Sequence, residues 1–296
     1  MATIAFIGVG NMGGGMAVNL VKAGHRVLAC DLLPANLERA VSEGCEQAES
    51  AAAAVAEADA VVSMLPAGKH VREVYENQVF LAAQPGTVLM DCSTIDVATA
   101  RSVVDAATAK GFVMVDAPVS GGVAAASAGT LTFMVGGTES AFGAAEPYLA
   151  RMGKAVIHAG DAGAGQAAKI CNNMLLAISM IGTCEAFNLA EKLGLDPQRF
   201  FEISSNASGQ CWSMTSYCPV PGPVPAAPSN RNYDGGFATA LMLKDLRLAV
   251  EAAQKVGAPT PLGAEAESLY AIFNGLGGAG KDFSAIIKML SGEWKG

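Results

Sequence analysis

Two polar side chains, Lys169 and Asn173, interrupt a long and mostly apolar stretch that runs from residue 165 to residue 193. Their i, i+4 spacing puts both on one face of a helix, where they could contact one small ligand together. A buried lysine can accept a proton when its pKa falls well below about 10.4, and an amide can both donate and accept hydrogen bonds. The alternative is that Lys169 extends to the surface and Asn173 caps a neighbouring segment.

A glycine-rich loop near the N-terminus has the spacing of a dinucleotide-binding loop. The apolar run 3–7 precedes Gly8-Val9-Gly10-Asn11-Met12-Gly13, and a helical pattern follows. In this arrangement Gly8 allows a tight turn, Gly10 lets the backbone approach a pyrophosphate, and Gly13 allows close packing of helix on strand. The next apolar run, 26–30, ends in Asp31, whose carboxylate could accept from ribose hydroxyls and would repel the 2′-phosphate of NADP. The order of these elements predicts an NAD site.

Further apolar runs alternate with helical segments, which predicts a parallel, doubly wound sheet. In such sheets ligands lie beyond the carboxyl ends of the strands, which here places Leu65-Pro66 and Ser93-Thr94 along the cofactor cleft. Ser93 or Thr94 could equally cap the helix that begins near Asp96. After another strand, Ser120-Gly121-Gly122 offers a hydroxyl and free backbone N–H groups to an anion. The predicted strands are 60–65, 87–91, 113–116, 129–137 and 155–159.

The remainder of the chain predicts helices. We expect one domain over residues 1–162 and a second, all-α domain over 163–296, which begins with the long helix that joins them. Helices are expected at 237–256, 261–273 and 283–290. The segment 217–232 carries five prolines, so we expect an extended loop laid over another surface.

The composition restricts the class of protein. Hydrophobic residues make up 51% of the 296 residues and charged residues 16%, so the chain can build large cores. A net charge of -8 argues against nucleic-acid or anionic-membrane surfaces. The seven cysteines form no C-x-x-C pair, and no metal-ligand spacing or secretory signal is visible, which predicts a reducing, cytoplasmic location without a metal. Lys169, Asn173 and Glu185 interrupt the apolar stretch, so we expect no membrane span.

Four separated motifs resemble the β-hydroxyacid dehydrogenase family over essentially the whole chain. They are FIGVGNMGGGMAVNLVKAGH, DAPVSGG, GDAGAGQAAKICNN and LMLKDLRLA. The resemblance implies an N-terminal Rossmann domain, a long interdomain helix, an α-helical C-terminal domain, NAD as cofactor and oligomers of two or four chains. Gly15 stands where the family usually has proline and is expected to loosen the first turn of the phosphate helix. Cys218 replaces a more usual polar residue.

The resemblance also implies roles for single residues. Lys169 matches the catalytic lysine and Asn173 the asparagine that orients the substrate. Ser120, Gly121 and Gly122 match the loop that holds the substrate carboxylate, and Lys244 matches a lysine near the nicotinamide and the substrate. Leu65, Pro66 and Thr94 match positions that contact NAD, beside the glycine-loop residues Gly8, Gly10, Asn11, Met12 and Gly13.

The segment around Cys211 and Trp212 is similar to the branch of the family that oxidises 3-hydroxyisobutyrate. We therefore expect oxidation of that β-hydroxy acid to methylmalonate semialdehyde in valine catabolism, with Lys169 taking the hydroxyl proton and Trp212 or Phe237 forming an apolar wall. Lys244 would help to lower the pKa of Lys169. One alternative is a semialdehyde, glyoxylate or tartronate semialdehyde reductase that uses NADPH. A second is a non-catalytic dinucleotide-binding sensor.

Overall fold

The computed structural model describes residues 1–295, and its chain folds as two compact units, Met1–Lys169 and Ile170–Gly296. The division lies inside one continuous helix, α9 (Ala164–Lys192). The domain boundary expected from the sequence, after residue 162, stands just before this helix. Each unit has its own hydrophobic core.

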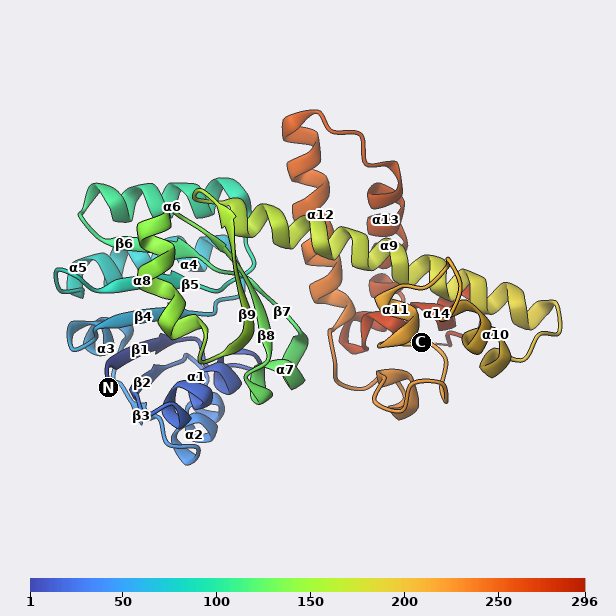
Figure 1. Ribbon diagram of the computed structural model, residues 1–296, viewed down its shortest axis with the longest axis horizontal. Helices are drawn as coiled ribbons and strands as arrows, with labels where there is room; N and C mark the ends of the chain where they lie inside the picture. Colours follow the sequence, from blue (N-terminus) through green and yellow to red (C-terminus); the bar gives the residue numbers. More distant parts are fainter. Residues whose placement is uncertain (296) are drawn as a thin grey trace. The chain divides into compact units, whose positions relative to one another are not determined.

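A nine-stranded sheet forms the centre of the N-terminal unit (Figure 1). The strands follow the order β3-β2-β1-β4-β5-β6-β8-β7, and β9 pairs with β8. The order reverses between β1 and β4, which confirms the predicted doubly wound fold and creates a crevice at their carboxyl ends. The strands are β1 (Thr3–Ile7), β2 (Arg26–Cys30), β3 (Glu46–Gln47), β4 (Ala60–Ser63), β5 (Val88–Asp91), β6 (Val113–Asp116), β7 (Val119–Ser120), β8 (Leu131–Gly136) and β9 (Gly153–Gly160).

The sheet is mixed rather than parallel throughout. Strands β1 to β6 pair in parallel, whereas β8 runs antiparallel to both β6 and β7. The prediction of a parallel sheet is therefore wrong at β8 and at β9, which pairs in parallel with β8. After β6 the chain stays at the carboxyl edge of the sheet, forms β7 and the short helix α7 (Gly122–Ala128) there, and returns in the opposite direction. A parallel return needs a crossover along the whole sheet, which this connection does not make.

Both faces of the sheet are buried because consecutive side chains of a strand point to opposite sides. On β1, Ile4 and Phe6 belong to one apolar cluster, whereas Ala5 and Ile7 belong to the other. Helices cover both faces and begin where the sequence supplies a cap, since Asp96 and Thr138 each accept the N–H three residues later. The remaining helices of this unit are α1 (Gly13–Lys22), α2 (Pro34–Ser42), α3 (Ala51–Ala56), α4 (Gly68–Val74), a π-helical turn (Tyr75–Val79), α5 (Phe80–Ala82), α6 (Val97–Ala109) and α8 (Glu139–Leu149).

The C-terminal unit is helical, as expected. Its core joins side chains of α9 such as Phe187 to Met242 of α12 and Phe273 of α13. The two helices predicted at 237–256 and 261–273 are found within two residues of those bounds, and the one predicted at 283–290 begins as a 3-10 turn. Helix α11 was not predicted. The helices are α10 (Pro197–Ser204), α11 (Trp212–Thr215), α12 (Thr239–Val256), α13 (Pro261–Gly275) and α14 (Ile286–Leu290), with 3-10 turns at Pro228–Arg231, Gly278–Gly280 and Phe283–Ala285.

Helix α9 is not buried on every side, contrary to the expectation from its composition. Leu175 and Leu189 are 64% and 60% exposed, because the unit's core covers only the side that carries Met180, Cys184 and Phe187. By length and composition alone the helix could cross a membrane, which corrects the prediction that its polar residues interrupt it too often. Its packed side shows that it also serves as the core helix of the unit.

The proline-rich segment 217–232 is a compact set of turns and not the extended loop that the sequence predicts. Ser229 donates its hydroxyl to the carbonyl oxygens of Cys218 and Val220, and the Tyr233 hydroxyl donates to that of Pro219. Prolines remove backbone donors, so these side-chain hydroxyls and the Asn230 amide supplement the few backbone hydrogen bonds of the segment.

Candidate active site

The glycine loop between β1 and α1 has room for a phosphate. Gly8 has a φ of +91°, and a Cβ there would lie 2.4 Å from the Met64 carbonyl oxygen. A Cβ on Gly13 would lie 1.9 Å from the Gly8 carbonyl oxygen, so the predicted turn and packing roles are confirmed. A Cβ on Gly10 would meet only the Asn36 amide nitrogen, at 3.8 Å. The open side of Gly10 and the N-terminus of α1 fit a pyrophosphate, although the Gly14 N–H already donates to the Gly10 carbonyl oxygen at 2.9 Å.

Asp31, at the end of β2, is half-buried and orients the glycine loop. One carboxylate oxygen accepts the Val9 N–H at 2.9 Å, and the other accepts the Leu33 N–H at 2.9 Å and the Asn36 amide at 3.1 Å. A carboxylate offers about four acceptor positions, which leaves capacity for a ribose hydroxyl. The Arg39 guanidinium, which the sequence left unassigned, donates to the Val9 carbonyl oxygen and to the Asn36 side chain, both at 3.3 Å.

Helix α1 packs unusually closely on α7, the helix that follows the Ser120 loop. A Cβ on Gly15 would lie 2.8 Å from the Ser127 nitrogen. The Asn19 amide donates to the carbonyl oxygens of both Gly15 and Ala126, at 2.9 and 2.7 Å. Gly15 therefore permits this close packing of α1 on α7, a role that the sequence did not predict.

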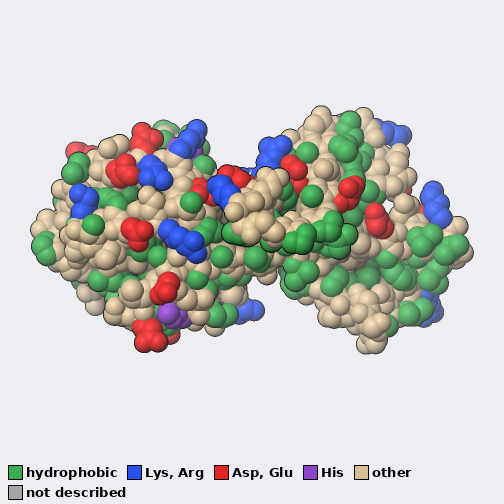
Figure 2. Space-filling view, turned by 90° about the horizontal axis from the view of Figure 1, so that it is seen from above, with side chains coloured by type: hydrophobic (Ala, Val, Ile, Leu, Met, Phe, Trp, Pro, Cys, Tyr) green, Lys and Arg blue, Asp and Glu red, His purple; other side chains and the backbone are tan. Residues whose placement is uncertain are grey.

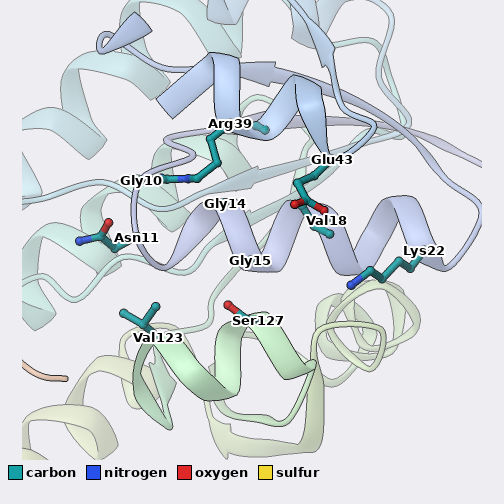
Figure 3. Close-up of a pocket in the computed structure, with 11 residues that line it drawn as sticks. Gly10, Asn11, Gly14, Gly15, Val18, Lys22, Arg39, Glu43, Val123 and Ser127 are labelled. Atoms are coloured by element: carbon teal, nitrogen blue, oxygen red, sulfur yellow. The ribbon is translucent and has the colours of Figure 1, made fainter. Parts of the chain in front are cut away.

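A groove of about 360 Å³ runs along α1 between α2 and α7 (Figure 3). Its walls include Gly10 and Asn11 of the glycine loop at one end and Lys22 at the other. Arg39 and Glu43 project into it from α2. Charges of both signs line the groove, so it has no preference for an anion beyond its end at the glycine loop.

A buried carboxyl, that of Asp91, holds the ends of β4 and β5 and the loops that follow them. One oxygen of Asp91 accepts the hydroxyls of Ser63 and Ser93, at 2.8 and 2.6 Å, and the Ser93 N–H at 3.2 Å. Burial raises the pKa of Asp91 to about 6, although these hydrogen bonds oppose the rise. The Ser93 hydroxyl in turn accepts the Leu65 N–H at 2.8 Å. Asp96 caps α6, so Ser93 and Thr94 do not cap it.

The start of α9 is attached to the same edge of the sheet. The carboxylate of Asp116, at the end of β6, accepts the N–H groups of Gly163 and Gln166, at 2.7 and 2.9 Å. Burial raises the pKa of Asp116, and these bonds oppose the rise. Lys169 lies one turn further along the helix and is only 7% exposed, so it does not extend to the surface.

The loop expected to hold a carboxylate takes a conformation that depends on glycine. Gly121 and Gly122 have φ values of +135° and +71°, in the region that side chains disfavour. A Cβ on Gly121 would also lie 2.6 Å from the Ala125 methyl group. Ser120 ends β7 and is half-buried, paired in register with Thr132 of β8.

In the C-terminal unit, a second carboxylate holds Asn173 from α12. The Asn173 amide donates to Asp245 at 2.5 Å, and its oxygen accepts from Asn172 at 3.0 Å. Asp245 is 2% exposed and also contacts Lys244 at 3.3 Å. Asn173 therefore binds a side chain within α12 and does not cap that helix, contrary to the alternative interpretation. One amide hydrogen and one acceptor position of Asn173 remain beyond these bonds.

The aromatic residues expected to form an apolar wall belong to one cluster. Trp212 stacks on Tyr217 with ring centroids 4.8 Å apart, and both Tyr217 and Phe237 contact Phe283, at 5.5 and 5.8 Å. Buried Asp282 accepts the Tyr217 hydroxyl at 2.7 Å and the Phe237 N–H at 2.8 Å. Its carboxylate therefore fixes two sides of the cluster.

Comparison with known proteins gives the family. Residues 3–160 match the model of the NAD binding domain of 6-phosphogluconate dehydrogenase, and residues 163–290 match that of the NAD-binding domain of NADP-dependent 3-hydroxyisobutyrate dehydrogenase. A probable mitochondrial 3-hydroxyisobutyrate dehydrogenase of Dictyostelium discoideum is 48% identical over 99% of this chain and 92% of its own length. The chain belongs to the 3-hydroxyisobutyrate dehydrogenase family of β-hydroxyacid dehydrogenases.

Two further members of the 3-hydroxyisobutyrate dehydrogenase family are similar over nearly their whole length. A solved structure of the Mycobacterium tuberculosis 3-hydroxyisobutyrate dehydrogenase with L-serine is 51% identical, with a TM-score of 0.93, and covers 98% of this chain and 99% of its own. The NAD-dependent L-serine dehydrogenase of Pseudomonas aeruginosa is 48% identical over 98% of each chain. The chain is accordingly an oxidoreductase that binds a nicotinamide dinucleotide.

Sequence reasoning missed the residues that hold this family's site in place. Asp91, Asp116, Asp245 and Asp282 accept hydrogen bonds from the predicted site residues or from the segments that carry them. A signal was present for two of them, because VLMD and VMVD each end a buried strand with a carboxylate. A charged residue in such a position must find hydrogen-bond donors when the strand is buried.

Proposed function

We propose that the chain oxidises 3-hydroxyisobutyrate to methylmalonate semialdehyde with NAD, the step that valine catabolism requires. The observation that carries the proposal is full-length similarity to enzymes of that name, at about half of all positions. The bound nicotinamide ring would accept a hydride from the carbinol carbon. Residues of this chain would accept the proton, orient the substrate and bind its carboxylate.

Lys169 is the group we assign to the hydroxyl proton. As the hydride leaves the carbinol carbon, the alcohol O–H bond breaks and its proton passes to the neutral Lys169 amine, so that the oxygen becomes a carbonyl. In the reverse direction the ammonium returns that proton. Asn173, one helical turn later, would hold the same oxygen with its remaining amide hydrogen or acceptor position. Its bond to Asp245 limits the rotation of the amide, which favours one orientation.

The substrate carboxylate is assigned to Ser120 and the backbone N–H groups of Gly121 and Gly122, with Lys244 as a further cation. Trp212 and Phe237 are assigned to the methyl branch. Their cluster is held by Asp282, which supports a wall of fixed shape. Loss of one methyl contact in such a pocket changes the free energy by about 1–3 kcal/mol.

The preference for NAD over NADP is assigned to Asp31. A 2′-phosphate would bring its negative charge against this carboxylate, and the two residues that follow, Leu32 and Leu33, offer no cation. Arg39 is engaged by the Val9 carbonyl oxygen and Asn36, which supports the same preference. Gly10, Asn11 and Met12 are assigned to the pyrophosphate, and Leu65, Pro66 and Thr94 to the rest of the dinucleotide.

L-serine is the second candidate substrate. It is also a β-hydroxy acid, with an amino group in place of the methyl branch, and a relative that is 48% identical is named for its NAD-dependent oxidation. An ammonium group beside an apolar wall is costly to desolvate unless a carboxylate accompanies it. Trp212 and Phe237 offer aromatic faces to a methyl branch, which favours 3-hydroxyisobutyrate, whereas the Asp282 carboxylate beside Phe237 keeps L-serine as the second candidate.

A substrate panel tests the proposal. Formation of NADH is followed at 340 nm with 3-hydroxyisobutyrate, L-serine, 3-hydroxypropionate and tartronate, each with NAD and with NADP. We expect the highest kcat/KM for 3-hydroxyisobutyrate with NAD, and a loss of several orders of magnitude in kcat for Lys169→Ala with dinucleotide binding retained. A tenfold advantage for L-serine would replace the substrate, whereas an active Lys169→Ala variant would remove the lysine from the mechanism.

We further propose a cytoplasmic homodimer or homotetramer. Leu175 and Leu189 of α9 support self-association, because two large apolar side chains exposed on one helix are commonly covered by another chain. Charged side chains of both signs are interspersed over the face in Figure 2, which does not favour nucleic acid or an anionic membrane as a partner. Light scattering after size exclusion, with Leu175→Glu as the disrupting variant, tests the oligomer.

A further inference from the structure

We propose that Gln166 is a positioning residue that sets the distance between Lys169 and the cofactor loop around Thr94. The inference rests on the proposed function, because it takes Lys169 as the base. Gln166 itself belongs to neither the substrate nor the dinucleotide residues assigned above. All the contacts that support it lie within the N-terminal unit.

The Gln166 side chain holds the backbone on both sides of Thr94. Its amide nitrogen donates to the Ser93 carbonyl oxygen at 2.7 Å, and its amide oxygen accepts the Ile95 N–H at 3.0 Å. Gln166 is completely buried, so no water competes for these bonds. One planar group therefore fixes the main chain of the cofactor loop from the side of α9.

The sheet also holds this loop, through the carboxylate of Asp91 at the end of β5. Ser93 binds Asp91 through its hydroxyl and N–H, and accepts the Leu65 N–H. The loops after β4 and β5 thus form one hydrogen-bonded unit. The Gln166 side chain joins this unit to the helix carrying Lys169.

Contacts with two strands also restrict the start of α9. A Cβ on Gly165 would lie 2.4 Å from the Met134 carbonyl oxygen and 2.7 Å from that of Asp116, so the helix already touches two strands. The Asp116 carboxylate holds the backbone N–H of Gln166. Strand contacts therefore fix the helix laterally, and the Gln166 side chain fixes its start relative to the cofactor loop.

A displacement of Gln166 would also move Lys169, because both residues lie on α9. Three residues of helix separate them by about 4.5 Å along the axis and keep them on neighbouring rows of one face. Proton transfer needs heavy atoms about 2.6–3.2 Å apart, and a misplacement of 1 Å can reduce the rate by about a hundredfold. The glutamine is therefore expected to act on kcat although it touches no reacting atom.

The test compares Gln166→Met and Gln166→Glu with the wild type. Methionine keeps the volume but makes neither hydrogen bond, while glutamate keeps the acceptor and loses the donor unless it is protonated. Gln198→Met, at an exposed position of α10, is the matched control. Steady-state kinetics with 3-hydroxyisobutyrate carrying deuterium at the carbinol carbon are combined with NADH binding followed by fluorescence.

For Gln166→Met we expect kcat to fall by about a hundredfold, the deuterium isotope effect on kcat to rise, and NADH to bind several-fold more weakly. Should this variant fail to fold, Gln166→Glu decides. In the reduction direction its kcat, relative to the wild type, should recover as the pH falls and a protonated glutamate again donates to the Ser93 carbonyl oxygen. A lower kcat with an unchanged isotope effect in Gln166→Met, or a relative kcat of Gln166→Glu that does not change with pH, would overturn the proposal.

Failure of the proposed function gives a different pattern. If Lys169→Ala keeps its activity, Lys169 is not the base and the premise is lost, whatever Gln166 does. If Lys169→Ala is inactive while Gln166→Met has wild-type kcat, only the positioning role is overturned.

Discussion

In the wild-type protein, Asp91 should lower the free energy of unfolding as the pH rises from about 4 to about 6. The variant Asp91→Asn should not show this decrease. Burial raises the pKa of this carboxyl from 3.8 to about 6, despite the hydrogen bonds from Ser93 and Ser63. Asp116, another carboxyl, contributes to the rise. In the unfolded chain the same group would titrate near 3.9.

The sign follows from counting protons. Between the two pKa values the native carboxyl keeps a proton that the unfolded chain has already released, so unfolding releases a proton there. The free energy of unfolding therefore falls as the pH rises through this window. At 1.36 kcal/mol per pKa unit, the difference between 3.8 and about 6 corresponds to about 3 kcal/mol, all of which is lost above the native pKa. An asparagine cannot titrate and lacks this dependence.

The measurement is the difference in free energy of unfolding between wild type and Asp91→Asn. Urea unfolding followed by far-UV circular dichroism at intervals from pH 4 to pH 8 gives the difference, in which other titrating groups cancel. Amide exchange in the β5 peptide serves as a local readout. Asp105→Asn, on the exposed side of α6, controls for the loss of one negative charge.

The difference should change by about 2 kcal/mol in favour of Asp91→Asn between pH 4 and pH 7, because part of the full effect is already lost at pH 4. A constant difference across this range would refute the assignment of the proton to Asp91. An equal change for Asp105→Asn would show that the effect belongs to net charge and not to the buried site.

Three further results are expected. Gly13→Ala should weaken NADH binding more than tenfold in a fluorescence titration, because its methyl group would overlap a carbonyl oxygen of the loop. Asp245→Ala should lower kcat about ten- to a hundredfold by releasing the Asn173 amide, whereas Asp245→Asn, which keeps an acceptor, should lose less in the same assay. Tyr217→Phe should lower the free energy of unfolding by about 1–3 kcal/mol in urea, because Asp282 loses one buried donor, with kcat little changed.

The sequence predicted those features that depend on neighbours along the chain. The glycine loop could be assigned glycine by glycine, since a turn and a helix–strand contact each demand a residue without a side chain at a fixed spacing. Strand and helix patterns gave the doubly wound order for the same reason. The bounds of α9 and α12 were predicted within two residues, because apolar periodicity and glycine ends are local signals.

Features that depend on distant partners were not predictable in this way. Nothing local in Leu131–Gly136 says that β8 runs antiparallel to β6, because direction is set by where the connection passes. Gln166 stands in a recognisable motif, yet its partners Ser93 and Ile95 are more than seventy residues away. The proline-rich segment was misjudged because the Ser229 and Tyr233 hydroxyls add hydrogen bonds to those of its own backbone turns, and no local pattern announces these side-chain bonds.

The close packing of α1 on α7 affects the entropic cost of binding a ligand at either loop. Gly15 and Asn19 join the helix that follows the glycine loop to the helix that follows Ser120. This contact restricts the movement of the two loops relative to each other. Part of the conformational entropy of the loops is thereby lost during folding, and less remains to be lost when a ligand binds. A larger residue at position 15 would separate the helices and transfer part of that entropic cost to each catalytic cycle.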